Sequence, residues 1–86
     1  MSSTPQDFPS DFPIKVMGRH DSDLRALTQA IVERHAGPIA DSSVKTRTSA
    51  DGNFLALTYV VHATSRAQLD KIYRELTACK SVLMAL

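Results

Sequence analysis

The hydrophobic and polar positions of this chain repeat one unit twice: a short apolar strand, a polar break, an amphipathic helix and a second strand. In chain order the expected strands and helices lie at residues 14–18, about 22–35, 44–48, 54–63, about 65–79 and 82–86. The order β-α-β-β-α-β predicts an α+β, ferredoxin-like sandwich, in which a four-stranded antiparallel sheet carries two helices on one face. Right-handed crossovers place the first and third strands in the centre and the second and fourth at the edges. The other face of the sheet is then open.

Alternation within the strands predicts which side chains form the core. One face of the longest strand carries Leu55, Leu57, Tyr59, Val61 and Ala63. The opposite face carries Ala56, Thr58, Val60 and His62, which together are less polar than a solvated face needs to be. Helical spacing predicts two further buried stripes, made by Leu24, Leu27, Ile31 and Val32 and by Leu69, Ile72, Tyr73 and Leu76.

Turn and cap residues define the ends of these elements. Gly37-Pro38 ends the first helix, because glycine tolerates the positive φ of a C-terminal cap and proline cannot continue the helix. Asp51-Gly52 predicts a hairpin between the second and third strands. Ser65 and Gln68 have the spacing of a capping box at the start of the second helix.

Length and composition limit the chain to one domain. Its 86 residues predict a single domain over 8–86 after a disordered tail over 1–7, with Phe8-Pro9 and Phe12-Pro13 as an extended lead-in. The formal net charge of +1 gives no strong field toward nucleic acid or a membrane surface. One cysteine, Cys79, fits a reducing compartment, and the sequence shows neither a membrane-length apolar stretch nor a secretory signal. A cytoplasmic location with no membrane partner is therefore expected.

The loop after the first strand is the first candidate ligand site, made by Gly18, Arg19, His20 and Asp21. Glycine lets a backbone approach a ligand closely, and the helix that follows offers free N–H groups to an anion. The Arg19 guanidinium adds a fork for a carboxylate or phosphate. The competing interpretation is a polar loop in which Asp21 or Ser22 caps the helix.

Neither catalysis nor a metal site is expected. An acylphosphatase-like phosphate cradle in this loop would need an asparagine beside it, and Asn53 is expected at the other end of the sheet. The three histidines, His20, His35 and His62, are not spaced as metal ligands, and no cysteine pair accompanies them. The sequence therefore predicts no enzyme activity, no metal and no cofactor.

The outer sheet face and the last strand form a second candidate surface, represented by Lys15, Thr58, Val60, His62 and Leu83. Lys45 and Arg47 are also expected to point to this face. RNA-binding domains of this topology carry aromatic residues on the central strands, which here have Lys15, Met17, Ala56, Thr58 and Val60 outward. Sequence-specific RNA binding is therefore disfavoured, whereas a partly apolar face suits self-association or a protein partner.

Several segments resemble the YbeD-like family of small bacterial proteins: Lys15-Val16-Met17-Gly18, Val44-Lys45, Ser49, Gly52-Asn53-Phe54 and Tyr73-Arg74-Glu75-Leu76. The resemblance runs from about residue 8 to residue 86. It implies a fold similar to the regulatory ACT domains of amino-acid metabolism, an ACT-like allosteric or small-molecule role and a link to lipoate metabolism. ACT domains commonly bind their ligand in the loop after the first strand, at a subunit interface.

Two functions are consistent with these observations, and weak RNA binding through the backbone, marked by a steep salt dependence, is a less favoured third. The first is a non-enzymatic regulatory or small-ligand-binding module that resembles ACT domains. Its ligand would bind at the Gly18 loop, and two copies of the chain would form a homodimer. The second is an adaptor that binds another protein through the open sheet face or the edge of the last strand. Changes at Gly18 or Arg19 are expected to impair the first function, and changes at Thr58, Val60 or Leu83 the second.

Overall fold

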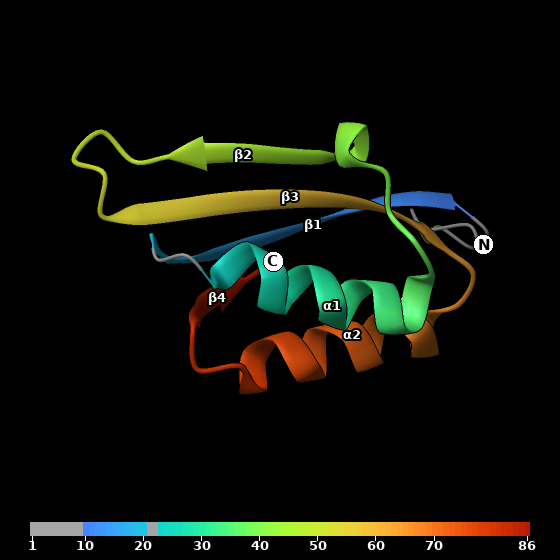
Figure 1. Cartoon of the computed structure of the whole chain (residues 1–86). Helices are drawn as coiled ribbons and strands as arrows, with labels where there is room; N and C mark the ends of the chain where they lie inside the picture. The colour runs from blue at the N-terminus through green and yellow to red at the C-terminus, as the bar shows by residue number, and fades with distance from the viewer. Residues whose placement is uncertain (1–9, 21–22) are drawn as a thin grey trace, which may run out of the picture.

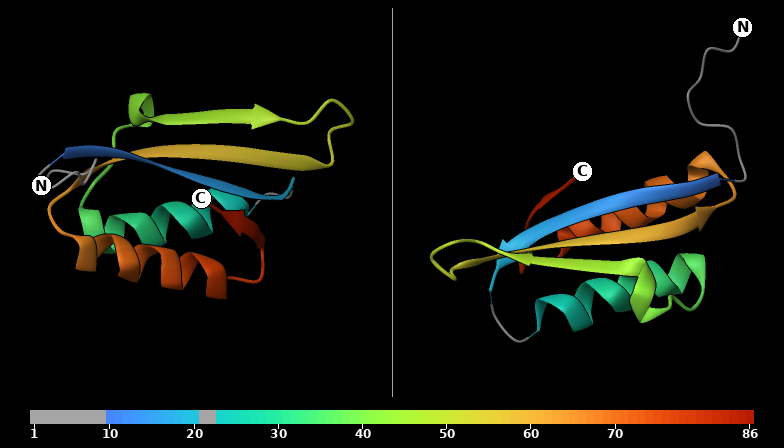
Figure 2. Two further views of the ribbon diagram at one scale, coloured as in Figure 1. Left: turned by 180° about the vertical axis from the view of Figure 1, so that it is seen from behind. Right: turned by 90° about the horizontal axis from the view of Figure 1, so that it is seen from above.

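The computed structural model describes residues 10–20 and 23–86, and within them it has the expected order of elements (Figure 1). The elements are β1 Ser10–Arg19, α1 Leu24–Ala36, the 3-10 turn η1 Asp41–Ser43, β2 Val44–Thr48, β3 Phe54–Ala63, α2 Arg66–Ala78 and β4 Val82–Ala85. The four strands form one antiparallel sheet in the order β2-β3-β1-β4, and both helices lie on one face of it (Figure 2). The ferredoxin-like fold is thus confirmed. The expected tail over 1–7, Phe8-Pro9 and the proposed caps Asp21 and Ser22 lie outside the described residues.

Strand β1 is longer than its apolar run predicts. It begins at Ser10 and pairs along its whole length with β3, so Phe12-Pro13 lies inside the strand and is not a lead-in to it. The backbone of Lys15 bonds to Leu86 on the β4 side, with N···O distances of 3.0 and 2.8 Å. Pro13, two residues earlier, directs its nitrogen to the same side, beyond the end of β4. Its missing N–H therefore removes no ladder hydrogen bond.

The core lies between the sheet and the two helices. Alternation in β3 is confirmed, because its five predicted inward side chains are at most 6% exposed. The predicted stripe of α2 is confirmed for Leu69, Ile72 and Leu76, while Tyr73 is only half-buried.

The buried stripe of α1 differs from the prediction. Leu24, Thr28 and Val32 are fully buried, whereas Leu27 is 43% exposed and Ile31 is half-buried. Thr28 can enter the core because its hydroxyl donates to the Leu24 carbonyl at 2.8 Å and lies 2.6 Å from the Tyr59 hydroxyl. A buried hydroxyl with both partners satisfied carries little desolvation cost.

The predicted caps and turns are present where the structure describes them. Ser65 Oγ accepts from the Gln68 backbone N–H at 3.1 Å, and Gln68 Oε1 accepts from the Thr64 backbone N–H at 2.7 Å. The reciprocal bond of the capping box thus reaches Thr64 and not Ser65. Gly37 after α1 and Gly52 in the hairpin have φ of 83° and 79°, as their positions require.

A charged clamp joins the two helices at their exposed side. The Glu75 carboxylate of α2 pairs with Arg34 of α1 and lies 2.5 Å from His35 Nε2. The hydrogen bond from His35, and to a lesser extent the charge of Arg34, lowers the pKa of Glu75 below its usual value.

Candidate functional site: the open face of the sheet

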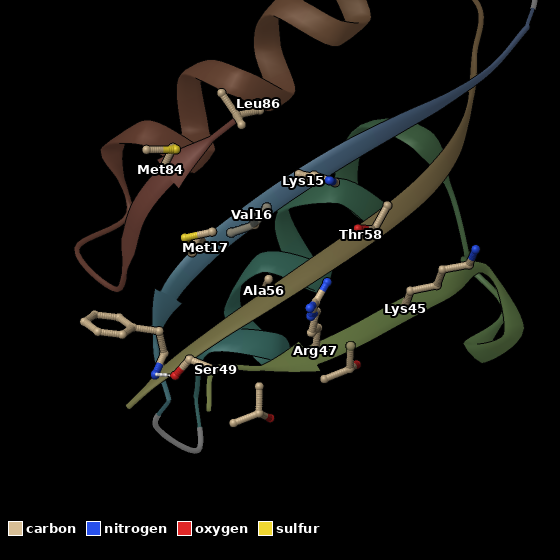
Figure 3. A pocket seen from close by; sticks show the side chains of 13 residues that line it. Lys15, Val16, Met17, Lys45, Arg47, Ser49, Ala56, Thr58, Met84 and Leu86 are labelled. Carbon is tan, nitrogen blue, oxygen red and sulfur yellow. Dashed lines mark hydrogen bonds between the residues drawn. The ribbon is translucent and has the colours of Figure 1, made fainter. Parts of the chain in front are cut away.

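The sheet face opposite the helices is uncovered and hollowed. Helices α1 and α2 both lie on the other face (Figures 1 and 2). On the open face the side chains of Lys15, Lys45 and Met84 are exposed. A depression of about 870 Å³ lies among them (Figure 3). We call it the open-face depression. Its lining residues are Lys15, Val16, Met17, Lys45, Thr46, Arg47, Thr48, Ser49, Phe54, Ala56, Thr58, Met84 and Leu86.

One side of the open-face depression is apolar and is formed by β4, the end of β1 and the start of β3. Met17 lies opposite Ala56 on one side and Met84 on the other, so the strand register places all three on this face. Leu86 follows β4 and is paired with Lys15 through the backbone. The exposed fractions of Met17, Phe54, Met84 and Leu86 lie between 38% and 65%. Exposed apolar side chains that cluster in this way mark interaction surfaces more often than isolated ones do.

The other side of the open-face depression is cationic. Lys45 of β2 and Lys15 of β1 both lie opposite Thr58 of the intervening β3, and Arg47 lies opposite Ala56. Figure 3 shows Lys45 and Arg47 on one side of the depression and Met84 and Leu86 on the other. All three cationic side chains are exposed, and none has an ion pair within residues 10–20 and 23–86.

None of the Asp and Glu side chains of the described residues lines the depression. Hydrogen-bond or ion-pair partners are identified for Asp11, Glu33, Asp41, Asp51, Asp70 and Glu75, and Asp23 also interacts with a partner. Of the identified partners, only Ser49 borders the depression. Among the residues that the structure describes, no Asp or Glu side chain in the depression therefore balances the positive charge of Lys15, Lys45 and Arg47.

The predicted outer-face residues fall into three places. Lys15 and Thr58 line the open-face depression. Val60 and His62 point outward on the same face but lie toward the other end, where His62 Nδ1 is 3.5 Å from Asp11 and a smaller hollow of about 350 Å³ lies. Leu83 is 56% exposed at a register shift in β4, where Gly18 faces Val82 and Met17 faces Met84. Such a bulge interrupts the regular pairing of β4, the strand whose edge was proposed to bind a partner.

The predicted loop begins later than expected, because Gly18 and Arg19 belong to β1 and pair with Leu55 and Phe54 of β3. Gly18 is buried and is not among the glycines with positive φ. A Cβ at this position would lie 2.3 Å from the Ser81 carbonyl oxygen and 2.9 Å from Leu24 Cδ1. Close packing of β4 and α1 against β1 therefore accounts for this glycine. Arg19 is exposed, and Asp21 lies outside the described residues.

The hairpin lies beside this loop, which corrects the expected position of Asn53. His20 donates its backbone N–H to the Asn53 carbonyl at 2.8 Å, and His20 Nδ1 is 3.2 Å from the Gly52 carbonyl oxygen. The prediction that Asn53 lies at the other end of the sheet is therefore wrong. The reason is the register: the end of β1 pairs with the start of β3, so Arg19 faces Phe54.

The perturbed pKa values belong to structural contacts. Burial raises the pKa of Tyr59 and of Tyr73, and the Ser49 hydroxyl lowers the pKa of Asp51 in the hairpin. None of these side chains, nor Glu75, lines the open-face depression. Within the described parts of the chain, no three His, Cys, Asp or Glu side chains lie close enough to hold a metal ion.

Sequence reasoning included Met84 and Leu86 only as part of the last strand, and it did not assign to this face the lining residues Val16, Thr46, Thr48, Ser49 and Phe54. Period-two alternation from Ala56 back to Phe54 would have placed the phenylalanine outward. No local signal gives the direction of Met84 and Leu86, because the bulge resets the alternation of β4.

Comparison with known proteins gives matches over most of the chain. The family described as "Protein of unknown function (DUF493)" matches residues 3–86. A UPF0250 protein of Ralstonia nicotianae is 42% identical over 80 residues, covering 93% of this chain and 82% of the relative. A UPF0250 protein of Chromobacterium violaceum is 47% identical over 81 residues, covering 93% and 90%.

A solved structure shares the fold. The solution structure of the C-terminal domain of the MgtC protein from Mycobacterium tuberculosis matches with a TM-score of 0.59 at 15% identity, covering 94% of this chain and 88% of that one. In the described residues, neither helix has the length and apolar character needed to cross a membrane.

Proposed function

This chain belongs to the DUF493 family of bacterial proteins, as its resemblance to YbeD-like proteins predicted, and we propose that it is a non-enzymatic regulatory module that binds another molecule on the open face of its sheet. We place this module in the cytoplasm, in keeping with its single cysteine. The observation that carries the proposal is the open-face depression, which joins an uncovered apolar half to an unbalanced cationic half.

Physical reasons favour the open face over the Gly18 loop. The absence of a side chain at Gly18 is required by Ser81 and Leu24, so it is not evidence for ligand approach. The backbone N–H of His20 is already used by Asn53. On the open face, in contrast, Met17 is 42% exposed, and no described helix or strand packs over it.

The absence of enzyme activity can be tested directly at the Gly18 loop. Arg19 and Asn53 lie at the same end of the sheet, as an acylphosphatase-like site would need. We expect no turnover of an acyl phosphate above the buffer rate. Turnover that disappears in Arg19→Ala but persists in Arg47→Ala would contradict the proposal.

The binding test is a ¹H–¹⁵N spectrum of the labelled protein, titrated separately with an acidic amphipathic peptide, octanoate, lipoate, a set of amino acids and a short RNA. We expect saturable shifts at Lys15, Met17, Arg47 and Ala56 with at least one of these probes. Saturable shifts confined to residues 17–23 would favour the Gly18 loop instead. No saturable shift on the open face with any probe would refute the proposed site.

A matched pair of variants separates site effects from general effects. Met17 and Leu27 have nearly the same exposed fraction, 42% and 43%, but they lie on opposite sides of the domain. Met17→Ala is expected to weaken binding about three- to tenfold, because it removes an exposed apolar contact. Leu27→Ala is expected to leave the affinity unchanged. Equal effects of the two variants would show that the open face is not the contact surface.

A further inference from the structure

The arrangement of the open-face depression says what kind of molecule fits it. Its apolar and cationic halves are neighbours across the sheet (Figure 3). Met84 and Met17 lie on β4 and β1, and Arg47 and Lys45 lie on β2. Lys15 of β1 stands between them, opposite Thr58. A complementary ligand is therefore apolar along one side and anionic along the adjacent side.

The unbalanced charge excludes a second copy as the simplest occupant. Two open faces packed around a twofold axis bring the same set of residues from each copy into the contact. Such an interface would bury Lys15, Lys45 and Arg47 of both copies, and no Asp or Glu side chain lines the depression to pair with them. Burial of unpaired charges is costly, so the depression favours a different molecule that brings carboxylates of its own.

The shape of the surface favours a protein segment over a small amphiphile. Small-molecule sites enclose most of the ligand surface. Here both helices lie on the other side of the sheet, so a small ligand would be covered on one side only (Figure 2). In a helix of a larger protein, the side that faces away from the sheet is covered by the rest of that protein. The flexible side chains of Met17 and Met84 suit such a surface, because methionine adapts to the shape of its partner.

Resting on the proposed function, we propose that the open face binds an amphipathic helix of a partner protein that carries an apolar stripe and, beside it, a row of carboxylates. The apolar stripe lies over Met17, Met84 and Leu86. The carboxylates lie over β2, where they pair with Lys45 and Arg47. The mode is a helix laid along a complementary apolar surface, with the charges setting its orientation.

The test uses three designed helical peptides of about 20 residues, a length above that at which isolated helices are marginal. All three peptides share one leucine stripe. The positions beside the stripe are all glutamate in the first peptide, all glutamine in the second and all lysine in the third. Affinity for the whole protein is measured by fluorescence anisotropy at low and high salt. The glutamate peptide is expected to bind at least about tenfold more tightly than the lysine peptide at low salt, with a smaller difference at high salt.

Charge-reversed variants test whether the preference for the glutamate peptide over the lysine peptide comes from the cations of β2. Lys45→Glu with Arg47→Glu is expected to remove or invert the order of the glutamate and lysine peptides. The matched control is Lys71→Glu with Lys80→Glu, which makes the same change in net charge at exposed positions away from the depression and should keep the original order. If the reversed variant does not fold, as judged by its amide spectrum, Lys45→Gln with Arg47→Gln replaces it and should remove the preference.

The outcomes distinguish this inference from the proposed function. Equal binding of the three peptides, or an unchanged order in the β2 variants, overturns the helix proposal. Saturation of the open face by octanoate or RNA, but not by the glutamate peptide, also overturns it and leaves the proposed site standing. No saturable shift on the open face with any probe refutes both.

Discussion

Replacing Gly18 by alanine separates the two explanations of this glycine, ligand approach and close packing. The added Cβ would lie 2.3 Å from the Ser81 carbonyl oxygen, a backbone atom, and 2.9 Å from Leu24 Cδ1. Leu24 is fully buried, so its side chain cannot move into solvent. To accommodate the methyl group, the turn before β4 must move away from β1 and Leu24 must repack.

The magnitude follows from two opposing effects. Overpacking a well-packed site typically costs about 1–3 kcal/mol, and a backbone clash this close belongs at the upper end. Restricting the unfolded chain returns about 0.4–1 kcal/mol. The net loss is therefore about 2 kcal/mol of a total free energy of unfolding of roughly 4–13 kcal/mol for a domain of this length. The corresponding fall in Tm is on the order of 10 °C.

The assay is urea and thermal unfolding followed by far-UV circular dichroism, with Gly52→Ala as the control. Gly52 has open space around its Cβ position but a φ of 79°, so its replacement strains the backbone and causes no clash. We expect Gly52→Ala to lose less stability than Gly18→Ala, about 1 kcal/mol or below. A Gly18→Ala protein within about 0.5 kcal/mol of the wild type would refute the packing explanation and return this residue to the ligand-binding hypothesis.

Two further changes test contacts that hold α1 to its neighbours. Tyr59→Phe removes the hydroxyl that lies 2.6 Å from Thr28 and is expected to lower the free energy of unfolding by about 1 kcal/mol. Thr28→Val should lower it less in the Tyr59→Phe background than in the wild type. If the two losses simply add in urea unfolding, the two hydroxyls do not share a contact. Burial raises the pKa of Tyr59, so the wild type should lose stability as the pH rises above about 10, and Tyr59→Phe should reduce that loss. The pKa of Glu75 is lowered by His35, so its stabilising effect is present above its usual pKa of about 4.3 and is lost as the pH falls below it. Glu75→Gln should therefore flatten the acid side of the stability profile, and an unchanged profile would show that the contact contributes nothing.

The sequence determined the order and type of the elements because each depends on local spacing. The period-two pattern of β3 placed Leu57 inward and Thr58 outward, and Gly37 and Gly52 marked the turns that need positive φ. These signals act within a few residues, so no knowledge of distant contacts was required. The ferredoxin-like topology then followed from the order together with the handedness of the crossovers.

The tertiary structure decided the rotation of α1, the extent of β1 and the composition of the open face. Thr28 is buried in place of Leu27 because the Tyr59 hydroxyl, 31 residues away, makes its burial possible. Strand β1 includes Pro13 because β3 pairs with it there and β4 does not reach it. The bulge in β4 places Met84 beside Met17, next to the cations of β2. Helix rotation and strand register are set by contacts between segments far apart in the chain, and no local pattern contains them.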